Sequence, residues 1–467
     1  MPGSEFTKPL EQRRIQRVIG PLERFLHVEA ASGGILLLAT LVAICFANSP
    51  WAEPYLAIWK TKIGFSFADF EMKHSLKHWI NDGLMVIFFF LIGLEVKREL
   101  VLGELKDLRR AVLPIVGAIG GMVVPACIYL VMQGDGPASR GWGIPMATDI
   151  AFVVGCLAVL GRKVPPGLRI LVLSIAIADD IGAILVIAIG YTETIHVVPL
   201  VLGVNALLLV NLLSRFGLRS FGVYTILGML AWMAFHESGI HATIAGVILG
   251  IMTPAVHFFD RSLAAKFLDR VSDVLHGGEW DTKAHRAASV RRVQQVTRET
   301  VSPLEYLEAT LHPWVSFAIV PMFALANAGV AISMDDLGAP VSLAVIAGLV
   351  FGKPLGIVGA CGLAVALRIA KMPAGVNFRM LIGAGFLAGI GFTMALFIDE
   401  LALMGDARGQ AKVGVIAASA VAAVIGMSIL ATIPTPNRTD EANEEDDGAV
   451  GEGDHDAADE TGELPQE

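Results

Sequence analysis

Two adjacent carboxylates, Asp179 and Asp180, lie in the middle of an apolar stretch at residues 168–191. The stretch is long enough to cross a bilayer, since about 20 helical residues span the hydrocarbon. One aspartate at that depth costs about 2.5 kcal/mol or more, and a second adds like-charge repulsion. The plain alternative is a structural pair held by hydrogen bonds, but such a pair would not need two charges. The pair therefore favours a site for protons and cations inside a membrane.

Two further ionisable side chains, Asp149 and Lys353, also lie in apolar segments. Adjacent helical residues point about 100° apart, so one aspartate of the 179–180 pair is expected to face a cation and the other Lys353 or Asp149. Carboxylate, hydroxyl and carbonyl oxygens suit a hard cation such as Na⁺. Carboxylates that hold either protons or a cation supply the competition that exchange requires. Two roles stay open for Lys353, a static counter-ion and a proton carrier.

The composition predicts a polytopic α-helical membrane protein. Of the 467 residues, 54% are hydrophobic and only 17% are charged, and the mean hydropathy is +0.64. The formal net charge of −9 comes from residues 438–467, where thirteen acidic residues stand against one arginine, so residues 1–437 carry +3. The acidic balance therefore indicates a solvated tail and carries no information about a substrate.

We expect three regions in the chain. Residues 1–29 are a cytoplasmic N-terminal segment with a surface helix, 30–432 a twelve-span transporter domain, and 433–467 an acidic disordered cytoplasmic tail. Within the second region, residues 55–77 are expected to form a hairpin outside the membrane and residues 258–311 a cytoplasmic loop.

Alternating apolar side chains predict the hairpin. Residues 58–63 and 65–69 alternate on either side of Gly64, as two strands joined by a turn would. Because an exposed two-stranded hairpin is marginal alone, a partner such as the same hairpin of a second subunit is plausible.

The twelve expected spans give an orientation. With the N-terminus inside, short cytoplasmic loops hold 19 basic residues and outside loops 7, which places both termini in the cytoplasm. The spans are expected at 30–48, 79–99, 111–132, 144–161, 168–191, 197–213, 220–235, 238–257, 312–332, 341–367, 379–399 and 410–432.

Two of these spans, 144–161 and 379–399, are interrupted by glycines. They come second in the triplets formed by spans three to five and ten to twelve. Paired broken helices in corresponding positions indicate inverted-topology repeats around a site at the membrane midplane. The alternative for the glycines is close helix packing, which is common in membranes.

Several motifs resemble those of the bacterial NhaA-type sodium/proton antiporter family, and the similarity covers about residues 20–432. Among them are Ala-Thr-Asp-Ile-Ala-Phe and Ala-Asp-Asp-Ile-Gly in the candidate site. The motifs lie at 81–85 with 93–99, 147–152, 178–182, 239–243, 311–314, 352–356 and 389–394.

The resemblance implies a transporter, not an enzyme, that needs no cofactor. It implies a homodimer joined through the outside hairpin in the bacterial cytoplasmic (inner) membrane, contacting membrane lipid and no nucleic acid. The implied activity is electrogenic export of Na⁺ or Li⁺ in exchange for H⁺, by alternating access and with pH-regulated activity.

The resemblance also implies roles for single residues. Asp180 would be the main Na⁺ ligand and Asp179 its partner in gating and proton transfer. Asp149 and Lys353 would compensate helix ends, with Thr148 beside the site.

Five more residues would act away from that site. Asp82, Glu95 and Glu99 would line a cytoplasmic funnel, and His241 and Glu308 would belong to the pH response. A helix-end hydrogen bond is the alternative role for His241. Glu95 and Glu99 could instead form salt bridges with Lys97, Arg98 or other neighbours.

Other functions that use membrane carboxylates fit less well. Intramembrane aspartyl proteases carry their aspartates on separate helices, one within Gly-x-Gly-Asp, which occurs here only in the tail at 451–454. A sodium-coupled symporter would need a roomy polar pocket, and no span clusters arginines or aromatic residues for one. A channel is disfavoured because paired broken repeats are typical of carriers.

Overall fold

The computed structural model describes residues 29–67, 70–192, 194–216, 221–255 and 302–433. The predicted N-terminal surface helix, the acidic tail and most of the predicted 258–311 loop lie outside these residues. In the described part, eight helices are long and apolar enough to cross a membrane, or up to ten if each of two bent helix pairs is one span. A multi-pass helical membrane fold is confirmed, while the twelve spans stay a prediction.

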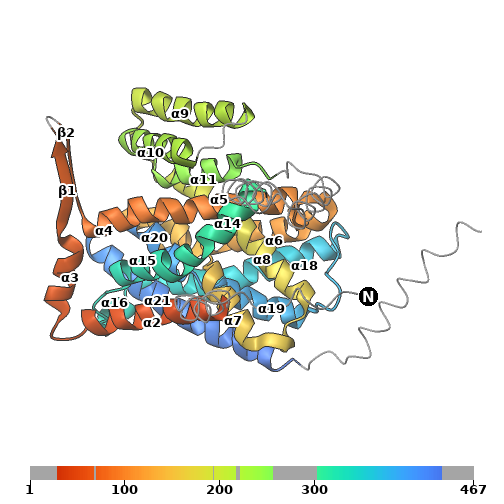
Figure 1. Cartoon of the computed structure of the whole chain (residues 1–467). Helices are drawn as coiled ribbons and strands as arrows, with labels where there is room; N and C mark the ends of the chain where they lie inside the picture. The colour runs from red at the N-terminus through yellow and green to blue at the C-terminus, as the bar shows by residue number, and fades with distance from the viewer. Residues whose placement is uncertain (1–28, 68–69, 193, 217–220, 256–301, 434–467) are drawn as a thin grey trace, which may run out of the picture.

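The first half of the fold carries a hairpin and the helices on either side of it (Figure 1). In order, the elements are α2 (Glu29–Ala47), α3 (Ala52–Lys60), β1 (Lys62–Phe67), β2 (Phe70–Ser75), α4 (Leu76–His78), a π-helical turn (Trp79–Leu84), α5 (Met85–Val101), α6 (Leu108–Gln133), a 3-10 segment (Pro137–Met146), α7 (Ile150–Leu160), α8 (Pro166–Gly190), α9 (Val197–Arg215), α10 (Phe221–Glu237) and α11 (Thr243–Met252).

The second half returns through the same bundle, so that its helices pack among those of the first half (Figure 1). Its elements are α14 (Pro303–Trp314), a π-helical turn (Val315–Ile319), α15 (Val320–Asn327), α16 (Met334–Leu337), α17 (Pro340–Ile346), a third π-helical turn (Ala347–Gly352), α18 (Lys353–Ala366), α19 (Phe378–Ala388), α20 (Phe392–Ala402) and α21 (Gly405–Ala431).

The predicted hairpin is present, but its strands lie further along the chain than expected. β1 and β2 are antiparallel, with Lys62 opposite Ser75 and Phe67 opposite Phe70. Gly64, expected at the turn, lies inside β1. The sheet projects from one end of the helical bundle (Figure 1).

Residues 58–60, expected in the first strand, belong to helix α3 instead. Tyr55 and Trp59, four residues apart, meet edge to face with ring centroids 5.9 Å apart. Residues at that spacing are neighbours on a helix, and this aromatic contact prevails over the weaker two-residue alternation.

The predicted 258–311 loop ends too late, because α14 already begins at Pro303. The Ser302 hydroxyl accepts a hydrogen bond from the Glu305 N–H, and the Glu305 carboxylate accepts one from the Ser302 N–H. This capping box, with proline at the first helical position, is a strong helix start that the charged loop composition concealed.

Candidate functional site

Two interrupted helices meet at their breaks inside the protein. Residues 147–149 are extended between the 3-10 segment Pro137–Met146 and α7, and α19 and α20 meet at a 45° bend after Ala388. Both predicted interruptions are therefore present. The two breaks are joined directly, since the Asp149 N–H donates to the Ile390 carbonyl at 2.7 Å.

Two glycines in the second break let the chains come this close. A Cβ at Gly389 would lie 2.5 Å from the carbonyl oxygen of Leu349, and one at Gly391 would lie 3.1 Å from that of Ala147. Close packing and helix interruption, which the sequence left as alternatives, occur together here. The absent side chains allow the backbone groups of the breaks to approach one another.

Asp149 serves the N-termini of two helices at once. Its Oδ1 accepts a hydrogen bond from the Phe152 N–H of α7 at 3.1 Å, and its Oδ2 accepts from the Thr393 N–H of α20 at 3.0 Å. The Thr393 hydroxyl also donates to Oδ2 at 2.5 Å. A carboxylate suits this place because both helix ends present unpaired N–H groups and positive dipole ends.

Replacing Asp149 by Ala removes the acceptor of both helix starts, so we expect a clear loss of stability. The loss of free energy of unfolding should be about 2 kcal/mol, since each cap contributes about 0.5–2 kcal/mol. Asp149→Asn keeps one side-chain oxygen and should lose less. Thermal melts of the detergent-purified variants measure the loss of stability in each. Equal losses in Asp149→Ala and Asp149→Asn would contradict the capping role.

Lys353 and Asp179 form a buried ion pair beside the two breaks. The ammonium Nζ lies 2.6 Å from Asp179 Oδ2, and the two side chains are 1% and 2% exposed. Lys353 also donates to the Met146 carbonyl, at the C-terminal end of the 3-10 segment. The cation therefore meets a carboxylate and the negative end of a half-helix together.

The Asp179 carboxylate is engaged on one oxygen only. The Thr148 hydroxyl lies 2.7 Å from Asp179 Oδ2 and 3.0 Å from the Ala388 carbonyl, so it links α8 to both breaks. Asp179 Oδ1 is buried and has no hydrogen-bond partner among the described residues. One carboxylate oxygen therefore stays available next to Asp180.

Asp180, the next residue on α8, is 4% exposed. In the described ranges, no hydrogen bond or ion pair joins its carboxylate to another residue. A buried carboxylate without a partner is costly unless it holds a proton or a cation. The two aspartates thus divide as the helical geometry predicts, with Asp179 held by protein groups and Asp180 left open.

The position of Lys353 follows from its local sequence. It comes directly after the π-helical turn Ala347–Gly352, and Pro354 follows it. Proline has no N–H to donate to the carbonyl four residues earlier, which favours a locally widened turn. The widened turn therefore comes directly before Lys353, whose ammonium pairs with Asp179.

Asp82 lies apart from Glu95 and Glu99 along the same membrane helix. Asp82 is in the π-helical turn near the hairpin, and the two glutamates are near the other end of α5. Glu99 accepts hydrogen bonds from the Ser174 hydroxyl at 3.1 Å and the Glu104 N–H at 3.0 Å. The structure thus brings only the two glutamates together at one end.

The remaining two predicted residues make local contacts. Glu308 on α14 forms an ion pair with Arg98 of α5. His241 Nδ1 lies 2.6 Å from the Thr243 hydroxyl and accepts a long hydrogen bond from the Thr243 N–H. His241 therefore makes the helix-end hydrogen bond at the start of α11 that was its alternative role.

Asp399 was missed from the sequence. It is fully buried on α20, and neither of its carboxylate oxygens has a hydrogen-bond partner in the part of the chain that the structure describes. The next residue, Glu400, pairs with Lys77 at 2.8 Å, Arg408 at 2.7 Å and Lys412 at 3.4 Å. An aspartate at the end of an apolar span was the available signal, the same one that identified Asp149.

Comparison with known proteins shows the family of the chain. The family model described as Na⁺/H⁺ antiporter 1 matches residues 23–430. A relative from Rhodopirellula baltica named Na⁺/H⁺ antiporter NhaA is 56% identical over 431 residues, which cover 92% of this chain and 98% of that protein. Relatives from Acidiphilium cryptum (NhaA 2; 93% of this chain, 97% of that protein) and Rhizobium meliloti (NhaA; 92% and 98%) are each 46% identical. The chain is a multi-pass membrane transporter that belongs to the Na⁺/H⁺ antiporter 1 family.

Proposed function

We propose that this antiporter exports Na⁺ or Li⁺ in exchange for protons at the Asp179–Asp180 site, by alternating access and with net movement of charge. One observation carries the proposal. Two adjacent buried carboxylates lie beside the breaks of two helices, and among the described residues Asp179 Oδ1 and the Asp180 carboxylate have no hydrogen-bond or ion-pair partner. Oxygen ligands beside a fixed cation suit a site that holds either protons or a hard cation.

The proposed cycle is a competition between the two ions. Asp180 binds the cation first because no group of the described residues engages its carboxylate, and Asp179 Oδ1 completes the ligand set from the same helix. Binding of the cation requires loss of protons from the pair, since a protonated carboxyl is a poor ligand for Na⁺. Rocking of the bundle around the two breaks then exposes the site to the opposite face.

The same proposal includes the arrangement in the membrane. We place the protein in the bacterial cytoplasmic membrane with both termini inside, in keeping with the excess of basic residues in the expected cytoplasmic loops. Twelve spans in inverted repeats and a homodimer belong to the proposal. The projecting β1–β2 sheet supports the dimer, because an isolated two-stranded sheet gains stability from pairing (Figure 1).

Regulation by pH is proposed for the end of α5 that carries Glu95 and Glu99. The Arg98–Glu308 ion pair joins α5 to α14 at this end. The two glutamates and this contact between α5 and α14 therefore lie at the same end of α5.

Ion fluxes in proteoliposomes test the proposal. Purified full-length protein is reconstituted, a proton gradient is imposed, and the pH-sensitive fluorescence is followed after addition of Na⁺, Li⁺ or K⁺ across a range of pH. We expect collapse of the gradient with Na⁺ or Li⁺ and not with K⁺, with a rate that changes when valinomycin clamps the potential. Rates indifferent to membrane potential would contradict electrogenic exchange.

A further inference from the structure

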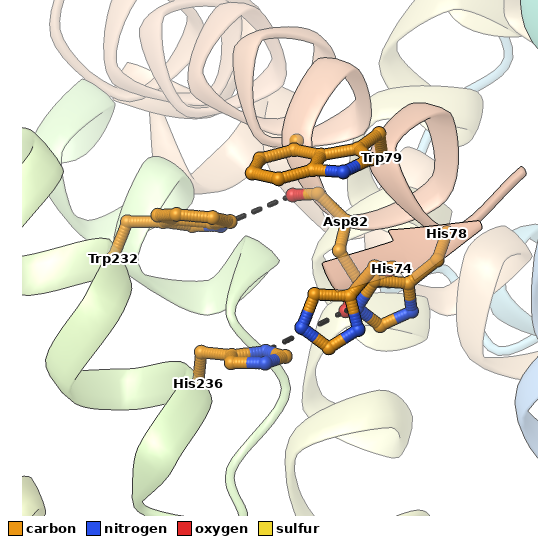
Figure 2. Close-up of a pocket in the computed structure, with 7 residues that line it drawn as sticks. His74, His78, Trp79, Asp82, Trp232 and His236 are labelled. Atoms are coloured by element: carbon orange, nitrogen blue, oxygen red, sulfur yellow. Dashed lines mark hydrogen bonds and ion pairs between the residues drawn. The ribbon is translucent and has the colours of Figure 1, made fainter. Parts of the chain in front are cut away.

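Three histidines from separate elements meet at the base of the hairpin. His74 is the second-last residue of β2, His78 ends α4, and His236 lies in the last turn of α10. One ring nitrogen of each lies within 4.8 Å of those of the others. Figure 2 shows His236 reaching from α10 toward His74 and His78 on the opposite wall. The contact brings together residues that are more than 150 positions apart in the chain.

A carboxylate completes the cluster. Asp82 Oδ2 lies 3.6 Å from His78 Nε2 and 3.7 Å from His236 Nδ1. The Trp232 indole N–H donates to the Asp82 backbone carbonyl at 3.1 Å, which holds α10 against this turn (Figure 2). This hydrogen bond holds α10, which carries His236, against the turn that carries Asp82, and it uses none of the proposed ligand atoms.

The four side chains line a pocket of the size of one ion. Its other walls are Trp79, Gly83 and Trp232. The pocket offers about 10 Å³ of space to the centre of a water-sized particle, which is close to the least that holds one water molecule. A single metal ion fits that space.

We propose that His74, His78, His236 and Asp82 bind a divalent transition-metal ion of the Zn²⁺ class. Three imidazoles with a carboxylate form a borderline ligand set that suits zinc, whereas Na⁺ prefers oxygen ligands alone. Nothing in the exchange of Na⁺ for protons needs such nitrogen ligands. The site is therefore separate from Asp179 and Asp180, and the inference does not rest on the proposed function.

The ligand atoms need to move only a short way to bind zinc. Tetrahedral ligands at about 2.0–2.1 Å from zinc lie roughly 3.3 Å from one another. The Asp82 contacts to His78 and His236 already come near that spacing, at 3.6 and 3.7 Å. The histidine side chains are partly exposed, so rotation of the rings can close the remaining gap.

A bound ion would fasten α10 to the hairpin end of the bundle. The helices α9, α10 and α11 share a small core of their own, formed by Leu207, Ala231, Phe235 and Ala245. Figure 1 shows α9 and α10 at the edge of the molecule, beside α11. Zinc would therefore raise the melting temperature of the protein, because binding only to the folded state stabilises it.

Zinc binding by the whole protein in detergent tests the proposal. Full-length protein, freed of any purification tag and stripped with a chelator, is titrated with zinc sulfate, and bound zinc is measured by elemental analysis and by competition with a chromogenic chelator. We expect one tight site per chain and a higher melting temperature with zinc. His78→Gln and His236→Gln should weaken this site by about tenfold or more.

Two further measurements separate ligation from general effects. His196→Gln, which changes an exposed histidine outside the cluster, should keep the tight site. Cobalt(II) in place of zinc should give the absorption bands of a tetrahedral ion in the unmodified protein and in His196→Gln, and none in His236→Gln. Equal zinc binding by the unmodified protein and a His78→Gln, His236→Gln double variant, with unchanged elution volume, would overturn the proposal.

Discussion

Asp180→Asn should abolish Na⁺-dependent collapse of a proton gradient in everted vesicles or proteoliposomes. The Asp180 carboxylate is buried and has no hydrogen-bond or ion-pair partner in the described part of the chain, so the change removes a negative charge and leaves the Lys353–Asp179 pair in place. Because an amide binds neither a proton nor Na⁺ with useful strength at this depth, we expect the rate to fall by about a hundredfold or more, equivalent to about 2.7 kcal/mol.

Controls separate loss of the site from loss of the fold. Asp335→Asn changes an exposed aspartate of α16 by the same chemistry and should transport normally. Asp180→Asn itself should elute and melt like the unmodified protein, or melt higher, because a buried carboxylate has been replaced by a neutral group. Full exchange in an Asp179→Asn, Asp180→Asn double variant would refute the site assignment.

Lys353→Met should cause the largest loss of stability. It leaves the Asp179 carboxylate buried without the cation that lies 2.6 Å away, and breaking one side of a buried pair costs about 3–5 kcal/mol. The melting temperature and the exchange rate should both fall. Adding Asp179→Asn removes the orphaned charge, so the double variant should regain most of the melting temperature and none of the transport.

Lys353→Arg distinguishes the two roles left open for this residue. A guanidinium keeps its charge at every accessible pH and can therefore act only as a counter-ion. If Lys353 is a counter-ion, Lys353→Arg should still exchange Na⁺ for protons. If Lys353 carries a proton, the variant should bind Na⁺ but move charge differently, which current measurements on proteoliposomes resolve. For the preceding test, a Lys353→Met, Asp179→Asn double variant that melts no higher than Lys353→Met alone would contradict the buried ion pair between Lys353 and Asp179.

Secondary structure was predictable where one pattern dominated. Long apolar segments identified the membrane helices and glycine clusters identified both breaks, because hydrophobicity and backbone freedom belong to the residues themselves. The hairpin strands were placed too early, because residues 58–60 fit the alternation of the predicted first strand but belong to helix α3. The Tyr55–Trp59 ring contact is one that the helical spacing makes possible.

Contacts between distant segments could not be predicted in the same way. His74, His78 and His236 carry no common motif, and they become a cluster only because α10 packs against the hairpin base. The family resemblance grouped Asp82 with Glu95 and Glu99, which lie on the same expected span. The length of that helix separates Asp82 from the glutamates and leaves it with the histidines.

The sequence alone determined which residues are costly in a membrane. Asp149, Asp179, Asp180 and Lys353 were identified because the free energy of burying a charge depends mainly on the side chain and the apolar span around it. The tertiary structure decided how they divide their roles. Lys353 and Asp179 are 174 positions apart, and which aspartate meets the lysine depends on the rotation of α8 and the meeting of two broken helices. These follow from packing across the whole bundle, which no local pattern records.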